Sequence, residues 1–82
     1  MYNIYIIYSD TKDRYYVGKC ADLDERLRRH NTNHKGFTGK DKDWRVVYFE
    51  TFDDPKLAGK REIEIKKWKS RKMIEKLIAF KE

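Results

Sequence analysis

Five side chains within residues 5–30 are of types that phosphodiester chemistry uses: Tyr5, Tyr16, Lys19, Arg26 and His30. A tyrosine hydroxyl can activate or position a nucleophile, and a cation can stabilise charge on a transferring phosphoryl group. Individually these residues are unspecific, because most strand tyrosines only pack and many arginines only cover apolar surface. These five side chains can form a functional site only if the fold brings them together.

The two tyrosines lie on strands that the hydrophobic pattern predicts. Residues 2–8 are rich in β-branched and aromatic side chains, which indicates a buried strand, and residues 14–18 indicate a second one. The polar segment 9–13 has turn composition, so the two strands form an antiparallel hairpin. Tyr5 and Tyr16 therefore lie on paired strands.

A helix follows the hairpin and presents an arginine and a histidine beside its inner face. Asp22 is its predicted N-cap, Glu25 completes a capping box, and the helix should end near residues 30–31. Arg26 and His30 are four residues apart and face the same way. They border an apolar stripe formed by Leu23 and Leu27. An arginine held by packing at such an edge can offer its donors to two phosphate oxygens.

The rest of the chain predicts one more strand and two more helices. Residues 31–43 indicate a surface loop, and residues 44–52 a third strand. Asp54 and Pro55 start a helix that runs to about Lys69, and Ser70 can cap a third. The apolar faces of these two helices are predicted to hold Leu57, Ala58, Ile65 and Trp68, and then Met73, Ile74, Leu77, Ile78 and Phe80.

This order of elements defines a fold class. We expect an α+β fold, ββαβαα, with a small, mainly antiparallel three-stranded sheet flanked by three helices. The 82 residues fit a single domain, residues 1–82.

The charge balance favours an anionic partner. The 20 Lys and Arg residues against 14 Asp and Glu give a net charge of +6, and nucleic acid is the commonest such partner. Cys20 is the single cysteine, so an intramolecular disulfide is excluded and a reducing compartment is favoured. The sequence has neither a secretory leader pattern nor a long apolar run, from which we expect a cytoplasmic protein.

The second helix supplies the candidate metal ligands. Glu62 and Glu64 lie on either side of its apolar stripe, and helical periodicity does not choose between them. One carboxylate suffices for Mg²⁺, which keeps waters and takes other ligands from substrate phosphate. A zinc site built from Cys20, His30 and His34 is disfavoured, because the chain has no second cysteine and no CxxC spacing.

A basic cluster lies where the second helix gives way to the third. It consists of Lys66, Lys67, Lys69, Arg71 and Lys72 around Trp68. Two interpretations are open: solvated lysines around a core tryptophan, or a ridge that contacts the phosphates of nucleic acid.

Together these motifs resemble the GIY-YIG endonuclease family, especially its small stand-alone bacterial members. Asn3-Ile4-Tyr5 stands at the first motif, with Asn in place of Gly, and Tyr16-Val17-Gly18 stands at the second. Lys19, the helix with Arg26 and His30, the third strand and Arg61-Glu62 follow in the order typical of the family. The resemblance runs from Tyr2 to about Leu77 and favours Glu62 over Glu64 as metal ligand.

The resemblance implies a role for each residue. Tyr16 would position or deprotonate the attacking water, or serve as the nucleophile, and Lys19 would lower its pKa. Arg26 would bind the scissile phosphate, and Glu62 would hold Mg²⁺ or Mn²⁺. Tyr5 would support the site by hydrogen bonding. His30 stands where relatives carry either Tyr or His.

The resemblance also sets expectations about the substrate. Members that cut defined sites carry additional DNA-binding domains, and these 82 residues contain none. We therefore expect cleavage of branched or nicked DNA, weak sequence specificity, or specificity supplied by a protein partner. The alternatives are a non-catalytic nucleic-acid-binding module that keeps the fold and a basic structural adaptor. A pure binder has no need of the Glu62 carboxylate.

Overall fold

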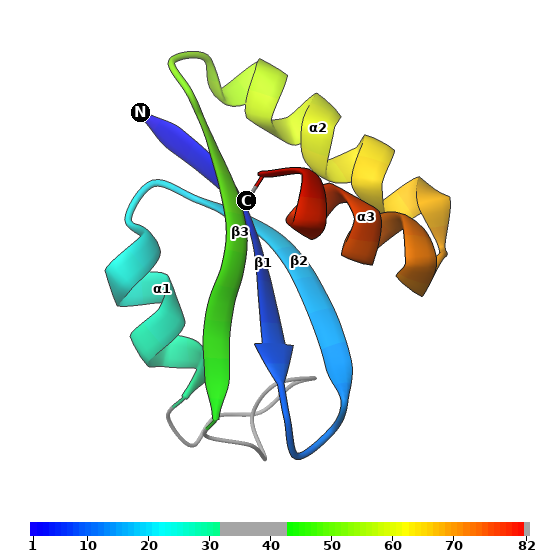
Figure 1. The fold of residues 1–82 in the computed structure, drawn as a ribbon. Coiled ribbons are helices and arrows are strands. Elements are labelled where there is room, and N and C mark those ends of the chain that lie inside the picture. The colour runs from blue at the N-terminus through cyan, green and yellow to red at the C-terminus, as the bar shows by residue number, and fades with distance from the viewer. Residues whose placement is uncertain (32–42, 82) are drawn as a thin grey trace.

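The computed structural model describes residues 1–31 and 43–81, and Figure 1 shows their arrangement. The elements in chain order are β1 (Tyr2–Ser9), β2 (Arg14–Cys20), α1 (Leu23–His30), β3 (Trp44–Phe52), α2 (Pro55–Trp68) and α3 (Arg71–Lys81). The predicted α+β class and ββαβαα order are confirmed.

The sheet has the order β2-β1-β3, and both pairs are antiparallel. β1 is the central strand, and the hairpin extends beyond its predicted ends because Asn3 pairs with Cys20 and Ser9 with Arg14. Helix α1 lies on one face of the sheet, and α2 and α3 cover the other (Figure 1). Burial on both faces explains why residues 2–8 form a continuous apolar run instead of an alternating one.

Each face of the sheet has its own core. Under α2 and α3 the buried residues are Ile4, Ile6, Val17, Tyr48, Ala58 and Ile65. On the α1 face they are Tyr5, Ile7, Cys20 and Trp44, with Leu23 and Leu27 packed against them. Tyr5 therefore belongs to the smaller core, between the sheet and α1.

Local signals set the helix ends much as predicted. The Glu25 N–H donates to Asp22 at 3.1 Å, and the Lys56 N–H donates to Asp54 at 2.9 Å. The capping box is only half formed, because the Glu25 carboxylate pairs with Arg28. Helix α2 ends at Trp68, and Lys69 follows it in the left-handed conformation at φ 48°.

Three apolar residues assigned to helix inner faces are exposed. Leu57 is 51% exposed, Met73 41% and Phe80 91%. The inner stripe of α3 consists of Ile74, Leu77 and Ile78. Met73 and Phe80 lie about 100° around the helix from the centre of this stripe, so they face solvent. Leu57 precedes the buried Ala58 by one residue, which turns it about 100° away from the sheet.

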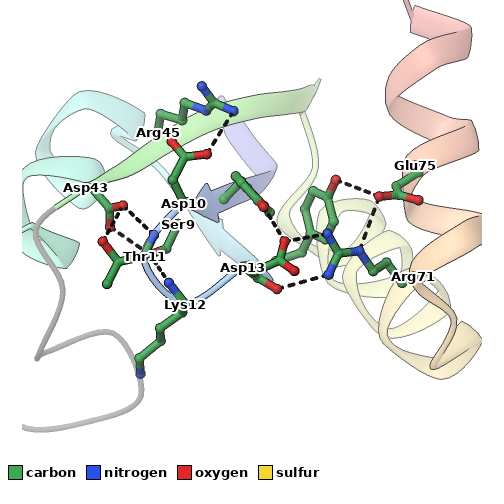
Figure 2. Close-up of polar contacts among 11 residues, drawn as sticks. Ser9, Asp10, Thr11, Lys12, Asp13, Asp43, Arg45, Arg71 and Glu75 are labelled. Atoms are coloured by element: carbon green, nitrogen blue, oxygen red, sulfur yellow. Dashed lines mark hydrogen bonds and ion pairs between the residues drawn. The ribbon is translucent and has the colours of Figure 1, made fainter.

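Two aspartates fix the turn between β1 and β2 to the rest of the molecule (Figure 2). Asp43 accepts hydrogen bonds from the Ser9 hydroxyl at 2.7 Å and the Thr11 N–H at 2.8 Å. Asp13 accepts from Arg71 at 2.6 Å, so the turn is joined to the start of α3. In the part of the chain that the structure describes, no helix has the length and apolar character needed to cross a membrane.

Candidate active site

The first candidate pair, Tyr5 and Gly18, lies directly across the β1–β2 ladder. The Tyr5 ring covers Gly18 so closely that a Cβ there would lie 2.4 Å from the phenolic oxygen. Only glycine leaves room for the ring. The glycine of the second motif is thus explained by the tyrosine of the first.

Tyr5, Tyr16 and His30 form an aromatic cluster on the α1 face of the sheet. The Tyr5 hydroxyl lies 2.8 Å from Nε2 of His30. The ring centroids of Tyr16 and His30 are 5.0 Å apart, and those of Tyr5 and Tyr16 are 6.4 Å apart. His30 is buried because α1 packs its last turn against this face.

Arg26 is half-buried on α1 and acts on the same cluster. Burial, and then the neighbouring Tyr16, raise the pKa of the Tyr5 phenol far above its ordinary value, while Arg26 opposes the shift by its charge and a hydrogen bond. Burial likewise raises the pKa of the Cys20 thiol, again opposed by Arg26. Tyr5 is therefore a protonated hydrogen-bonding group, and the Arg26 charge lies beside Tyr5 and Cys20.

Lys19 lies on the other face of the sheet, toward α2. It pairs with Ile4 in the ladder, and its Nζ would be 3.7 Å from a Cβ placed on Gly59. Strand alternation therefore directs Lys19 and Tyr16 to opposite faces of β2. Any electrostatic effect of the Lys19 ammonium on the Tyr16 side chain must therefore act around the outer edge of β2. Gly59 is thus a neighbour of the candidate site that sequence reasoning missed, although an isolated glycine in a helix was a signal.

Glu62 and Glu64 are distinguished by their surroundings. Glu64 is 57% exposed and pairs with Arg61, which also pairs with Glu50. The Glu62 side chain is only 20% exposed, and its Oε2 lies 3.1 Å from the Lys66 ammonium. Glu62 is also three residues beyond Gly59, on the side of α2 that Lys19 approaches.

The comparison with protein families gives the same assignment as the motifs. The model of the GIY-YIG catalytic domain matches residues 1–76. The chain belongs to the GIY-YIG family. GIY-YIG domains are generally endonucleases, so nuclease chemistry is the activity that the family implies. A search of curated proteins and a search of solved structures both find no match.

The departure from the GIY-YIG pattern at Asn3 is accommodated by the sheet. Asn3 pairs with Thr51 across β1 and β3, and its side-chain oxygen accepts from the Thr51 hydroxyl at 2.9 Å. The amide therefore adds a cross-strand contact. Asn3 precedes Tyr5 by two residues on the same face of β1, and Tyr5 keeps its place over Gly18.

The candidate site residues of this GIY-YIG domain are distributed over both faces of β2. Tyr5, Tyr16, Arg26 and His30 lie together on the α1 face. Lys19 is directed toward α2, the helix that carries Glu62, and β2 is an edge strand of the sheet.

The donor set for a metal in this GIY-YIG domain is small. Within residues 1–31 and 43–81 no three His, Cys, Asp or Glu side chains gather as a metal site would require. His34, one ligand of the disfavoured zinc site, lies outside the described residues. A single half-enclosed carboxylate, Glu62, fits Mg²⁺ or Mn²⁺, which keep water ligands and bind substrate phosphate.

The basic cluster is divided by its ion pairs. Lys67, Lys69 and Lys72 are exposed. Arg71 donates to both Asp13 and Glu75, and these contacts raise its pKa above the ordinary value. Arg71 therefore fixes α3 to the β1–β2 turn, a structural role that the sequence did not indicate. Trp68 is partly buried against the core, as the plainer interpretation of the cluster expected.

Proposed function

We propose that this chain is a metal-dependent endonuclease that hydrolyses DNA phosphodiester bonds, with selectivity for DNA structure or weak selectivity for sequence. The observation that carries the proposal is the buried contact between Tyr5 and His30, with Tyr16 and Arg26 beside it. A domain that only bound nucleic acid would need surface cations and no enclosed set of titratable groups.

Arg26 is the proposed phosphate ligand. A half-buried guanidinium is held by packing, and its planar fork matches two oxygens of the scissile phosphate. Its positive charge opposes the charge that accumulates in the transition state, where such a contact has the greatest effect on rate.

Tyr16 is the proposed group that positions or activates the attacking water. The Tyr16 ring is tilted against the His30 ring at a centroid distance of 5.0 Å. The Tyr5 hydroxyl lies 2.8 Å from Nε2 of His30, within hydrogen-bond distance, and Arg26 contributes positive charge beside the same phenol. Tyr5 thereby fixes the His30 ring next to Tyr16, and Lys19 adds positive charge from the far side of β2.

Glu62 is the proposed metal ligand. When bound, Mg²⁺ or Mn²⁺ would supply Lewis-acid stabilisation to the phosphate oxygens and the leaving group. In the absence of the ion, the Lys66 ammonium balances the Glu62 charge at 3.1 Å. Part of the Glu62 side chain remains exposed on α2, where a cation can reach it.

The test compares matched variants on nicked, flapped and branched DNA with Mg²⁺ or Mn²⁺. Arg26→Ala should lower kcat by about a thousandfold with the fold retained, because its charge acts on the transition state. Arg28→Ala on the same helix is the control, since Arg28 is exposed and pairs with Glu25 one turn away. Glu62→Gln should lose metal-dependent cleavage, and Glu64→Gln should keep it.

Two results would contradict the proposal. One is cleavage by Glu62→Gln at the wild-type rate with metal present, which would refute the metal ligand. The other is tight DNA binding by the wild type with no cleavage of any of these substrates. That outcome would favour the alternative of a non-catalytic binding module.

A further inference from the structure

A hollow of about 330 Å³ lies between β2 and the junction of α2 with α3. Its floor is apolar, formed by Val17, Ile65 and Ile74. Tyr15 adds an aromatic wall, and its ring also contacts Tyr8 and the Arg71 guanidinium. Its rim carries four cations, Arg14, Lys66, Lys69 and Arg71, and also includes Asp13 and Ser70. We call this feature the β2–α2 groove.

The chemistry of the β2–α2 groove is that of a nucleotide site. Proteins that hold single-stranded nucleic acid combine an aromatic platform for the bases with cations that follow the backbone. The volume is at the small end of ligand pockets, about 300 Å³, so one nucleotide fits and a base pair within a duplex does not. An apolar floor also disfavours an ordinary hydrated anion.

Two of the rim cations have their charge balanced inside the protein. Arg71 pairs with Asp13 and Glu75, and Lys66 pairs with Glu62. Lys69 and Arg14 are exposed, and Lys69 stands beyond the last turn of α2 because of its left-handed backbone. These two side chains are therefore the ones best placed to contact phosphate.

The groove and the proposed metal ligand share one neighbouring side chain. Lys66 lines the groove and at the same time lies 3.1 Å from the Glu62 carboxylate. A nucleotide in the groove would thus lie on the side of α2 that carries Glu62, near a phosphate held there.

We propose that the β2–α2 groove binds one unpaired nucleotide of the DNA strand adjoining the phosphate at Glu62. This inference rests on the proposed endonuclease function and names its substrate class. DNA with a single-stranded extension can place a nucleotide in the groove, whereas continuous duplex keeps its bases paired. The chain therefore prefers flapped DNA to intact duplex.

The test is binding in EDTA, which separates the groove from catalysis. Fluorescence anisotropy is measured with a labelled oligo(dT) and with a labelled hairpin duplex. The test variant Arg14→Glu/Lys69→Glu reverses two charges of the rim. The control, Lys60→Glu/Lys76→Glu, makes the same change in net charge at exposed positions of α2 and α3 outside the groove.

The groove variant should bind oligo(dT) about tenfold or more weakly than the control variant does, with duplex binding equal in the two proteins. An equal loss for both DNAs, or equal binding of oligo(dT) by both variants, would overturn the groove assignment. A selective loss in a protein that cleaves no substrate would retain the groove and refute the nuclease proposal. Cleavage of DNA without a selective loss of oligo(dT) binding would retain the nuclease proposal and refute the groove.

Photocrosslinking places the nucleotide directly. Oligo(dT) carrying 5-iodouracil is irradiated with the wild-type protein, and the adduct is mapped by mass spectrometry. The adduct is expected on Tyr15, the aromatic wall of the groove. Adducts confined to other aromatic residues would refute the site.

Discussion

The Tyr5 hydroxyl lies 2.8 Å from Nε2 of His30, and this buried contact joins the central strand to the last residue of α1. The two residues are 25 positions apart in the sequence, so the sequence alone did not predict that they are in contact. The same tyrosine lies over Gly18 of the neighbouring strand. Tyr5 thus connects both motif strands with the helix that carries Arg26.

Two glycine substitutions should have opposite effects on stability. Gly18→Ala places a Cβ 2.4 Å from the buried Tyr5 hydroxyl, and the forced shift should lower the free energy of unfolding by about 1–3 kcal/mol. Gly59→Ala meets only Lys19 Nζ at 3.7 Å and should raise stability by about 0.5–1 kcal/mol through helix propensity. Urea denaturation measures both, and a Gly18→Ala protein of wild-type stability would contradict the close approach.

The Tyr5→Phe variant keeps the packed ring and removes the hydroxyl, so it separates the packing of Tyr5 from its effect on the orientation of His30. The ring stays in place, and the loss of one buried hydrogen bond should reduce stability by about 1 kcal/mol. If Tyr5 orients His30 for reaction, kcat should fall about tenfold or more with KM little changed, and the pH–rate profile should shift. The control is Tyr2→Phe, on the same strand. An unchanged kcat and profile would reduce the Tyr5 contact to a structural one.

Acid should weaken the link between the β1–β2 turn and α3. Hydrogen bonds from Arg71, and then Tyr8, hold the Asp13 pKa below its ordinary value of 3.8. A depressed pKa means that the stabilisation is present above the unfolded value and is lost as pH falls through the folded one. Asn also tolerates the Asp13 backbone at φ 54°. The Tm of Asp13→Asn should thus lie below wild type near about pH 7 and converge with it below about pH 4.

The control for the acid prediction is Asp53→Asn, at an exposed position between β3 and α2. Its Tm should follow that of the wild type at neutral pH. A constant difference between Asp13→Asn and wild type across the whole pH range would show that charge is not the cause.

Removal of Lys66 should strengthen metal binding at Glu62. The Lys66 ammonium is 3.1 Å from the carboxylate and competes with a divalent cation for it. Lys66→Met keeps the apolar stem and removes the charge, and the Kd for Mn²⁺ should fall about two- to fivefold, as for a partly exposed ion pair. Titration followed by electron paramagnetic resonance measures the change. Lys60→Met serves as control, and equal affinities in both variants would argue against Glu62 as the ligand.

The sequence by itself determined the elements and most of the candidate chemistry. Local signals are strong here: Asp22, Asp54 and Ser70 cap helices, and the continuous apolar run 2–8 marks a strand buried on both faces. Capping and periodicity depend on residues close in the chain, so they can be inferred without a structure.

Only the tertiary structure decided which groups meet. Strand register placed Gly18 beneath Tyr5, and the packing of α1 brought His30 to the Tyr5 hydroxyl. Alternation along β2 sent Lys19 to the face opposite Tyr16. The fold also engaged Arg71 with Asp13, 58 residues away, and left Lys69 at a groove rim. Such contacts arise from long-range register and packing, because residue type fixes what a side chain can bind and only the fold fixes its neighbours.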